Sequence, residues 1–186
     1  GGGATGTLWR APRAGGVPRG VPEPVTSAGA DLAPDGKDLA GALLVAGKAR
    51  LEFPVGKTLV PQGVEAPRLS PGGDAIAFLE NGDGPSIAWI DREGKSKKTL
   101  SSGWDQIHGA PCWRPDGKEI WFTAAQRGES AGLRAVNLSG KRRLIRRAPG
   151  DLELDRVSRA RRGRLAPPTP DNLPPGPRAG ELQRAA

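Results

Sequence analysis

The chain has 186 residues and a formal net charge of +8, from 28 Lys and Arg against 20 Asp and Glu. No run of about 18 apolar residues is present, which excludes a helical membrane span, and the single cysteine, Cys112, excludes an internal disulfide and a cysteine-cluster metal site. Residues 141–186 hold 12 Lys and Arg against 5 Asp and Glu, whereas residues 1–140 hold 16 against 15. We therefore expect a basic C-terminal tail and an electrostatically balanced body.

A short turn sequence recurs along the chain, and an apolar run follows each copy. The copies are Ala33-Pro34-Asp35-Gly36-Lys37, Ser70-Pro71-Gly72-Gly73-Asp74 and Arg114-Pro115-Asp116-Gly117-Lys118. Proline presets φ at the first central position, Asp hydrogen-bonds nearby backbone, and glycine supplies a positive φ, so each copy predicts a strand, a turn and a second strand. The prolines are 37 and 44 residues apart, and a period near 40 indicates a repeat architecture.

A second pattern interleaves with these turns. Apolar and polar residues alternate and end at a glycine in four segments, Leu8 to Gly15, Leu51 to Gly56, Ile87 to Gly94 and Leu133 to Gly140. Further strand-like residues follow the last two, including Arg143-Leu144-Ile145, so this pattern predicts a second hairpin in each period. Four short antiparallel strands about every 40 residues are typical of a propeller blade.

The turn sequences carry a resemblance to a known family. The segment from Trp113 to Phe122 closely resembles the Pro-Asp-Gly repeats of TolB-like, WD-type β-propellers. The segment from Ser70 to Ile145 further resembles the propeller that follows the kinase domain in some bacterial serine/threonine kinases. The resemblance covers residues 7–150 and implies a non-enzymatic binding or sensing module for a protein or small ligand, and it leans toward an extracytoplasmic location. Gly72 departs from the family pattern, which has Asp there, so we expect a change in turn rigidity and not in fold.

We therefore predict an all-β chain, a partial β-propeller of four-stranded antiparallel blades in residues 1–150 with a disordered C-terminal tail. The end of one blade is expected at about 7–26 and further blades at 27–65, 66–109 and 110–150. Because propellers close with 4–8 blades, we expect the chain to be a segment of a longer protein, with its other blades in the parent chain, or a defective copy. We expect no specific nucleic-acid binding by the balanced repeat body.

Residues 151–186 have a different composition, rich in Arg and Pro and poor in apolar residues, which predicts disorder. Arg159-Ala160-Arg161-Arg162 stands where the repeat predicts the next Pro-Asp-Gly turn. One hypothesis is a shift of the coding frame near residues 151–160. The other interpretations are an electrostatic arm for nucleic acid or an acidic surface and a solvated terminus without a partner.

Catalytic motifs are present only out of context. Gly128-Glu129-Ser130-Ala131-Gly132 fits a nucleophile elbow, but that chemistry needs a following helix and a later histidine. Here the following residues alternate like a strand, and the single histidine, His108, precedes Ser130. Kinase motifs such as His-Arg-Asp and Asp-Phe-Gly are missing. We predict no catalytic, cofactor-binding or metal-binding residue, and we expect residues 128–132 to form a loop between the two hairpins of a blade.

A candidate recognition site precedes the last predicted blade. Trp104, Asp105 and His108 fall where the rim of a propeller would bind a ligand, and an exposed aromatic beside polar groups is a common anchor. The alternative is a surface loop whose tryptophan packs between blades. Cys112 is expected at a strand start as a buried structural thiol, and the other tryptophans, Trp9, Trp89, Trp113 and Trp121, are expected in the core between blades.

Two further interpretations of the function stay open. The chain could be the non-catalytic propeller of a prolyl-oligopeptidase-type serine peptidase, with catalysis in a separate domain. It could also be a non-functional gene fragment. The ligand, the total number of blades and the attached domain do not follow from the fold, because propeller rims differ in their loops.

Overall fold

The computed structural model describes residues 5–6, 9–10, 17, 19–20 and 25–147. Over these residues the chain consists of β-strands joined by turns. Blade 1 is formed by β4 (Val25–Leu32), β5 (Leu39–Val45), β6 (Lys48–Glu52) and β7 (Thr58–Val60), blade 2 by β8 (Val64–Leu69), β9 (Ala75–Asn81), β10 (Pro85–Asp91) and β11 (Lys97–Ser101), and blade 3 by β12 (Gln106–Trp113), β13 (Glu119–Ala125), β14 (Gly132–Asn137) and β15 (Arg142–Arg147). The predicted all-β fold with four-stranded antiparallel blades is confirmed.

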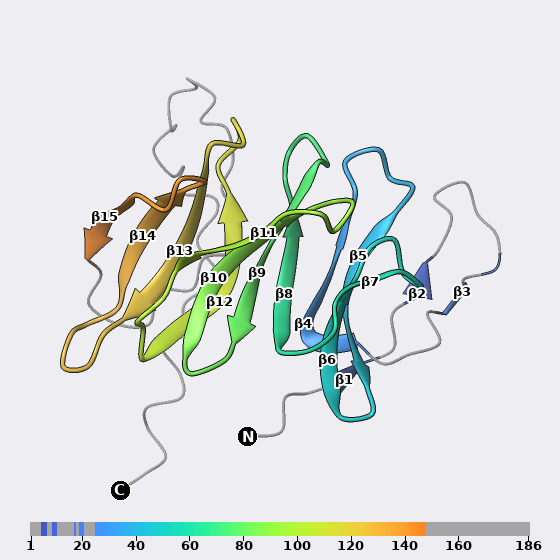
Figure 1. Cartoon of the computed structure of the whole chain (residues 1–186), viewed down its shortest axis with the longest axis horizontal. Helices are drawn as coiled ribbons and strands as arrows, with labels where there is room; N and C mark the ends of the chain where they lie inside the picture. Colours follow the sequence, from blue (N-terminus) through green and yellow to red (C-terminus); the bar gives the residue numbers. More distant parts are fainter. Residues whose placement is uncertain (1–4, 7–8, 11–16, 18, 21–24, 148–186) are drawn as a thin grey trace, which may run out of the picture.

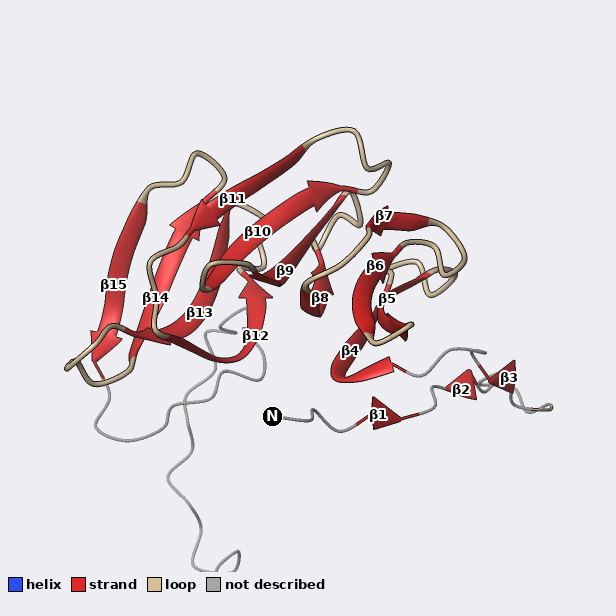
Figure 2. Cartoon of the chain, turned by 60° about the horizontal axis from the view of Figure 1, so that its bottom comes forward, coloured by secondary structure: helices blue, strands red, loops and turns tan. Residues whose placement is uncertain are grey.

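Each blade is a meander in which strands that follow one another in sequence pair antiparallel. The three sheets fan out from β4, β8 and β12, which lie side by side, while β7, β11 and β15 lie on the outside (Figures 1 and 2). Three short strands precede blade 1: β1 (Thr5–Gly6) extends its sheet by pairing with β4, and β2 (Trp9–Arg10) pairs with β3 (Arg19–Gly20).

The three Pro-Asp-Gly-type turns join the first and second strands of their blades with one hydrogen-bonding pattern. The glycine N–H donates to the carbonyl of the first turn residue at 2.8 Å, 2.9 Å and 2.8 Å in blades 1, 2 and 3. These glycines, Gly36, Gly73 and Gly117, have φ values of +71°, +73° and +71°, where a side chain would be strained. The predicted role of glycine in closing these hairpins is confirmed.

The turn of blade 2 keeps its shape without the usual Asp. In the other two turns Asp35 and Asp116 each accept an N–H from the residue two positions on, at 3.0 Å and 3.1 Å. In blade 2 the Ser70 hydroxyl accepts the backbone N–H of Asp74 at 3.1 Å and donates to the Asp74 carboxylate at 2.5 Å. A serine and an aspartate at the ends of the turn thus supply the bracing that Gly72 lacks.

The second hairpin of each blade is also present. In blades 2 and 3 it turns at Gly94 and Gly140, with φ of +84° and +96°. An acceptor side chain closes both turns: Asp91 accepts the N–H of Ser96 at 2.5 Å, and Asn137 accepts the N–H of Lys141 at 2.8 Å. The prediction of two hairpins per period is therefore confirmed for the three blades, whereas the copy from Leu8 to Gly15 lies almost wholly outside the described residues.

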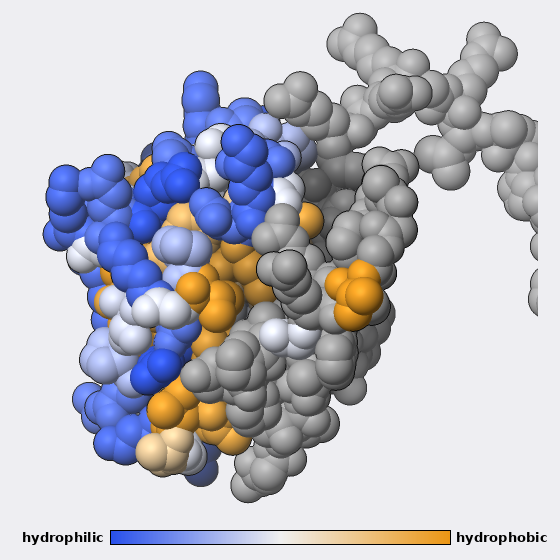
Figure 3. Space-filling view, turned by 90° about the vertical axis from the view of Figure 1, so that its right-hand side faces the viewer, coloured by the Kyte–Doolittle hydropathy of each residue, from blue (hydrophilic) through white to orange (hydrophobic). Residues whose placement is uncertain are grey.

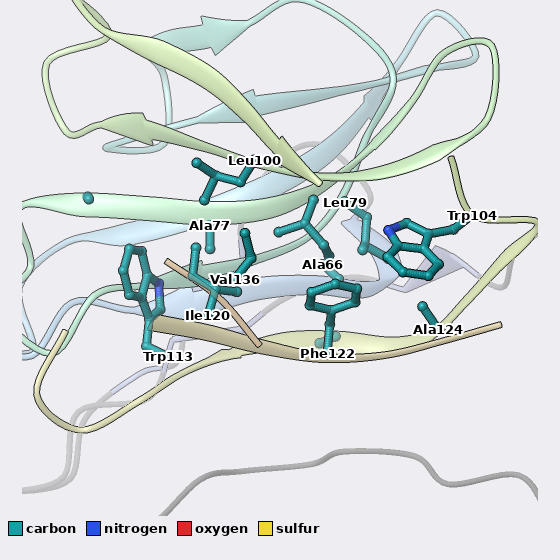
Figure 4. Close-up of a cluster of buried hydrophobic side chains, with 13 residues drawn as sticks. Ala66, Ala77, Leu79, Leu100, Trp104, Trp113, Ile120, Phe122, Ala124 and Val136 are labelled. Atoms are coloured by element: carbon teal, nitrogen blue, oxygen red, sulfur yellow. The ribbon is translucent and has the colours of Figure 1, made fainter. Parts of the chain in front are cut away.

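Two apolar clusters hold neighbouring blades together, because successive side chains of a strand point to opposite faces. In β9, Ile76 and Phe78 pack toward blade 1, in a cluster that includes Leu51 and Phe53. Ala77 and Leu79 pack toward blade 3, in a cluster with Trp104, Trp113, Ile120, Phe122 and Val136 (Figure 4). Blade 2 thus packs against a neighbouring blade on both of its faces. Hydrophobic residues also show on the end face of the molecule that is seen from blade 1 (Figure 3).

Polar contacts between the innermost strands add to this packing. The backbone N–H of Leu69 in β8 donates to the Asp31 carboxylate of β4 at 2.8 Å. The indole N–H of Trp113 in β12 donates to the carbonyl of Arg68 in β8 at 2.8 Å. Leu69 and Trp113 each directly precede the first residue of their blade's turn, so equivalent positions reach back to the preceding blade at both junctions.

The expected assignment of the basic charge to a tail is wrong in part. Five of the 12 Lys and Arg residues from position 141 onward lie in 141–147, which contains β15 and the residue before it. β15 is the outer edge strand of blade 3, and its four arginines are exposed. The folded body therefore carries a basic edge. The predicted tail, residues 151–186, lies outside the described residues.

The part of the chain that the structure describes contains no helix that could cross a membrane. Within 25–147, no three side chains among His, Cys, Asp and Glu are grouped so that they could hold a metal ion.

Candidate functional site

Trp104 lies in the connection between β11 and β12 and is buried, with 6% of its surface exposed. Its indole N–H donates to the Ser101 hydroxyl at 2.9 Å, and its ring meets Phe122 edge to face with the centroids 5.8 Å apart. Buried tryptophans usually satisfy their N–H in this way. The interpretation that this tryptophan packs between blades is confirmed.

Two arginines of blade 3 cover the ring of Trp104. The guanidinium carbon of Arg134 lies 4.4 Å from the ring centroid and that of Arg142 lies 5.7 Å away, both within the range of a cation–π interaction. Arg142 also donates to the carbonyl of Ser102 at 3.1 Å. Two cation–π contacts and one hydrogen bond therefore hold the loop between blades 2 and 3 against blade 3.

The other two predicted recognition residues do not share this environment. Asp105 is exposed, and its backbone N–H donates to the carbonyl of Ala125 at 3.1 Å. His108, expected before the blade, instead lies half-buried within β12, opposite Thr123. Cys112, expected at a strand start, lies near the end of the same strand, and it is buried as predicted. The recognition role of Trp104, Asp105 and His108 stays a prediction.

A hollow of about 450 Å³ opens beside Trp104. We call it the Trp104 hollow; its lining residues are Glu80, Gly82, Asp83, Gly84, Ser86, Ser102, Gly103 and Trp104. They come from the β9–β10 connection, the adjoining strand ends and the connection that follows β11. None of these lining residues is basic, so the hollow offers carboxylate, hydroxyl and carbonyl oxygens beside the buried Trp104.

Some polar groups of the Trp104 hollow already form ion pairs or hydrogen bonds within the protein, whereas Asp83 is exposed to solvent. Glu80 is paired with Lys97 and accepts the Thr99 hydroxyl at 3.1 Å. The buried Ser86 donates to the Glu80 carbonyl at 3.2 Å. Asp83 stands exposed at the tip of the loop. The hollow therefore presents an exposed carboxylate above a wall whose shape is held by hydrogen bonds.

Sequence reasoning missed Asp83, Ser86 and Ser102. The signal that could have found the first is the run Asn81-Gly82-Asp83-Gly84-Pro85, a glycine-rich loop between two predicted strands. Such loops lie at the surface and often carry function. No comparable signal marks the serines, since their position in the hollow depends on how the chain returns between blades.

A second hollow, of about 410 Å³, lies on the opposite rim between the turns of blades 2 and 3. We call it the turn hollow; its lining residues are Ser70, Pro71, Gly72, Asp74, Ala75, Trp113, Pro115, Asp116, Gly117 and Leu138. Leu138, from the β14–β15 turn, is 37% exposed, whereas Trp113 is buried. The turn hollow combines apolar walls with two carboxylates.

One strong ion pair lies elsewhere, on the face of blade 3 that points away from blade 2. The Arg143 guanidinium of β15 donates to both carboxylate oxygens of Glu119 in β13, at 3.1 Å and 2.7 Å. The Trp121 indole N–H donates to the same carboxylate at 3.2 Å. The hydrogen bonds from Arg143 lower the pKa of Glu119 to about 2, with help from Trp121. This group braces two strands and does not line either hollow.

Comparisons with known proteins support the fold. No protein-family model matches the sequence, and no curated protein matches it. A candidate TolB from Agrobacterium tumefaciens is similar over 74% of this chain and 55% of its own, with a TM-score of 0.62 and 16% identity. TolB from Acinetobacter baumannii is similar over 79% of this chain and 50% of its own, with a TM-score of 0.55 and 16% identity. The chain thus spans about half the length of these TolB structures.

Part of a hydrolase structure has a similar architecture. A puromycin hydrolase mutant is similar over 78% of this chain and 24% of its own, with a TM-score of 0.58 and 19% identity. At these identities the likeness concerns the fold alone. The chain has a TolB-like β-propeller fold, and residues 25–147 form three of its blades.

Proposed function

We propose that the chain is a non-enzymatic binding module that takes a protein segment or a small ligand at the Trp104 hollow. The observation that carries this proposal is the hollow itself, about 450 Å³ of space at a propeller rim with several oxygen acceptors beside the buried Trp104. Ligand sites are concave and combine an apolar surface with a few placed polar groups. An exposed Asp83 favours a ligand that carries hydrogen-bond donors, such as an amine or several hydroxyl groups.

A binding role fits the placement of the two residues, Ser130 and His108, that the catalytic motifs would use. Ser130 lies in the connection between β13 and β14, and a strand follows it where a nucleophile elbow needs a helix. His108 lies in β12 and pairs across the sheet with Thr123. Residues 128–131 lie in this connection as the sequence predicts, whereas Gly132 is the first residue of β14.

The parent protein is a separate part of the proposal. The resemblance of Ser70 to Ile145 to kinase-associated propellers supports a sensing module attached to a bacterial serine/threonine kinase. A second candidate is the non-catalytic propeller of a serine hydrolase, favoured by the structural similarity to the puromycin hydrolase mutant. Sequencing the gene on both sides separates them: an upstream Asp-Phe-Gly region supports the kinase, and a downstream hydrolase domain supports the peptidase.

The test of the binding site is a screen of the full chain against a panel of polyamines, monosaccharides and blocked dipeptides, followed by NMR of the ¹⁵N-labelled protein. We expect a hit to shift the indole signal of Trp104, and Asp83→Asn to weaken binding about threefold or more, as loss of one exposed charge contact would. Glu93→Gln is the control, an exposed acid of the β10–β11 turn that does not line the hollow. A hit weakened by Glu93→Gln and untouched by Asp83→Asn, or no hit in the panel, would count against this site.

A further inference from the structure

The two junctions between blades differ on the rim that carries the turns. An arginine side chain lies at the junction of blades 1 and 2, whereas the turn hollow lies at the junction of blades 2 and 3. Arg92 belongs to the β10–β11 turn, and its guanidinium carbon lies 5.4 Å from the centroid of the Phe53 ring. The guanidinium also lies 3.8 Å from the Asp38 carboxylate. The chain's own arginine thus sits between an aromatic ring and a carboxylate at one blade junction.

Leu138 occupies the equivalent position in blade 3. Arg92 follows Asp91 in a turn that closes with the Gly94 N–H donating to the Asp91 carbonyl at 3.0 Å. Leu138 follows Asn137 in a turn closed the same way, by Gly140 at 2.9 Å. Because the turns match residue for residue, Leu138 projects where an arginine would, with a shorter side chain and no charge.

The turns on this rim are also packed differently at the two junctions. At the first, a Cβ added to Gly73 would lie 3.2 Å from the Pro34 ring, so the turns of blades 1 and 2 are in contact. At the second, the turns that carry Pro71 and Pro115 leave the 410 Å³ turn hollow between them. Among the described residues, the second junction therefore has space for a side chain between these turns.

The lining of the turn hollow suits a guanidinium. Trp113 forms one wall, and its ring is held in place by the indole hydrogen bond to the Arg68 carbonyl at 2.8 Å. Asp74 and Asp116 supply carboxylates from the two turns. A planar guanidinium pairs with carboxylates and stacks on aromatic faces, which a lysine ammonium does less well. Two acids from the two turns match the first property, and the part of Trp113 that borders the hollow, a residue only 7% exposed, offers the second.

Two cations near the turn hollow are already engaged. Lys98 donates to the carbonyls of Leu138 and Ser139, at 3.4 Å and 3.0 Å. Arg114 lies 3.4 Å from one Asp116 oxygen and 3.5 Å from Glu119. Asp74 accepts a hydrogen bond from Ser70 and has no basic side chain among the residues that line the hollow.

We propose that the turn hollow binds an arginine side chain presented by an extended segment of a partner protein. This site lies on the rim opposite the Trp104 hollow and does not depend on a ligand binding there. The bound guanidinium would stand beside Trp113 and pair with Asp74 and Asp116, as Arg92 stands beside Phe53 and Asp38 at the neighbouring junction.

The test uses the ¹⁵N-labelled full chain and three blocked tripeptides, Gly-Arg-Gly, Gly-Lys-Gly and the neutral Gly-citrulline-Gly. We expect the arginine peptide to shift the Trp113 indole signal saturably, with a Kd in roughly the millimolar range, and the citrulline peptide to give no saturable shift. Asp116→Asn should raise the Kd about three- to fivefold, the effect of losing one partly exposed charge pair. Asp83→Asn, in the Trp104 hollow, should leave the Kd unchanged.

Leu138→Arg is the decisive variant, because it places an arginine at the position in blade 3 that Arg92 occupies in blade 2. We expect its own side chain to fill the hollow and to abolish binding of the arginine peptide, whereas Leu138→Gln, uncharged and of similar length to leucine, keeps it. The indole signals of the other tryptophans report that each variant is folded. Equal binding of the arginine and citrulline peptides, or a Kd that neither Leu138→Arg nor Asp116→Asn changes, would overturn the proposal.

Discussion

At the scale of single residues, the backbone conformation of the tight turns decides which side chains are tolerated. The β5–β6 hairpin turns through two residues, with Val45 paired to Lys48. Both turn residues have positive φ, +48° for Ala46 and +76° for Gly47. Two-residue turns of this kind favour Asn-Gly, because asparagine tolerates the left-handed region better than alanine does. Ala46 is therefore a strained residue in an otherwise well-formed hairpin.

Replacing this alanine should stabilise the protein. We expect Ala46→Asn to raise the free energy of unfolding by about 0.5 to 1 kcal/mol, because the left-handed conformation costs alanine about 1 kcal/mol or more. Urea unfolding followed by tryptophan fluorescence measures the change. Gly47→Ala is the opposite control and should lower the free energy of unfolding. A destabilised Ala46→Asn variant would show that the turn does not have this conformation in solution.

At the scale of elements, blade 3 is braced across its sheet by charge. Glu119 begins β13 and Arg143 lies in β15, so the bidentate pair between them bridges two strands that flank β14. The side chain of Glu119 is 17% exposed and that of Arg143 is 49% exposed. Because water screens the arginine in part, the pair contributes less than a fully buried one would.

This pair predicts a dependence of stability on pH. The pKa of Glu119 falls from 4.5 to about 2 on folding, so its stabilisation is complete above about pH 5 and is lost as the pH falls toward 2. We expect Glu119→Gln to lower the free energy of unfolding by roughly 1 kcal/mol at pH 7. The difference from the wild type should shrink as the pH falls to 3, measured by urea unfolding. A difference that stays constant over this range would contradict the assignment.

The elements that the sequence predicts well are those set by local chemistry. The Pro-Asp-Gly-type turns and the glycines of the second hairpins fix φ within four residues, so both hairpins of each blade follow from the sequence. The start of β12, in contrast, does not follow from the sequence. Gly109, with φ of +68°, and the register shift between His108 and Cys112 form a bulge inside one long strand. Glycine and proline before Cys112 look like a strand break in the sequence, although the strand continues through them.

The candidate site depends on contacts between blades, which the sequence pattern does not encode. Trp104 could be placed in a loop between blades, but whether its ring faces solvent depends on Arg134 and Phe122 of the next blade. The basic strand β15 is a related case. An outer edge strand can expose both of its faces, so Arg142 and Arg143 resemble a solvated tail although both lie in a paired strand.

At the scale of the whole molecule, stability is shared between neighbouring blades. Phe78 is fully buried in the cluster between blades 1 and 2, and Phe122 is fully buried in the cluster between blades 2 and 3. Repeat proteins in which each unit contacts only its neighbours have a stability close to the sum of unit and interface contributions. Damage to one cluster should therefore spread to the two blades that share it.

Hydrogen exchange of the full chain tests this arrangement. Phe78→Ala and Phe122→Ala each remove a large buried ring and should lower the free energy of unfolding by about 3 to 5 kcal/mol. We expect Phe78→Ala to reduce protection mainly in blades 1 and 2, and Phe122→Ala mainly in blades 2 and 3. Each variant is the control for the other. Equal loss of protection in all three blades with both variants would indicate one cooperative unit.

The position of the arginines on β15 bears on how copies of this molecule behave when they collide. An unpaired strand edge is a template on which a second chain can add its own strand. In the part of the chain that the structure describes, β15 has no neighbour on its outer side, and Arg142, Arg143, Arg146 and Arg147 lie on it. Arg143 is neutralised by Glu119, so Arg142, Arg146 and Arg147 are the charges that two identical edges would bring together as they approached. We expect their repulsion at low salt to oppose edge-to-edge aggregation.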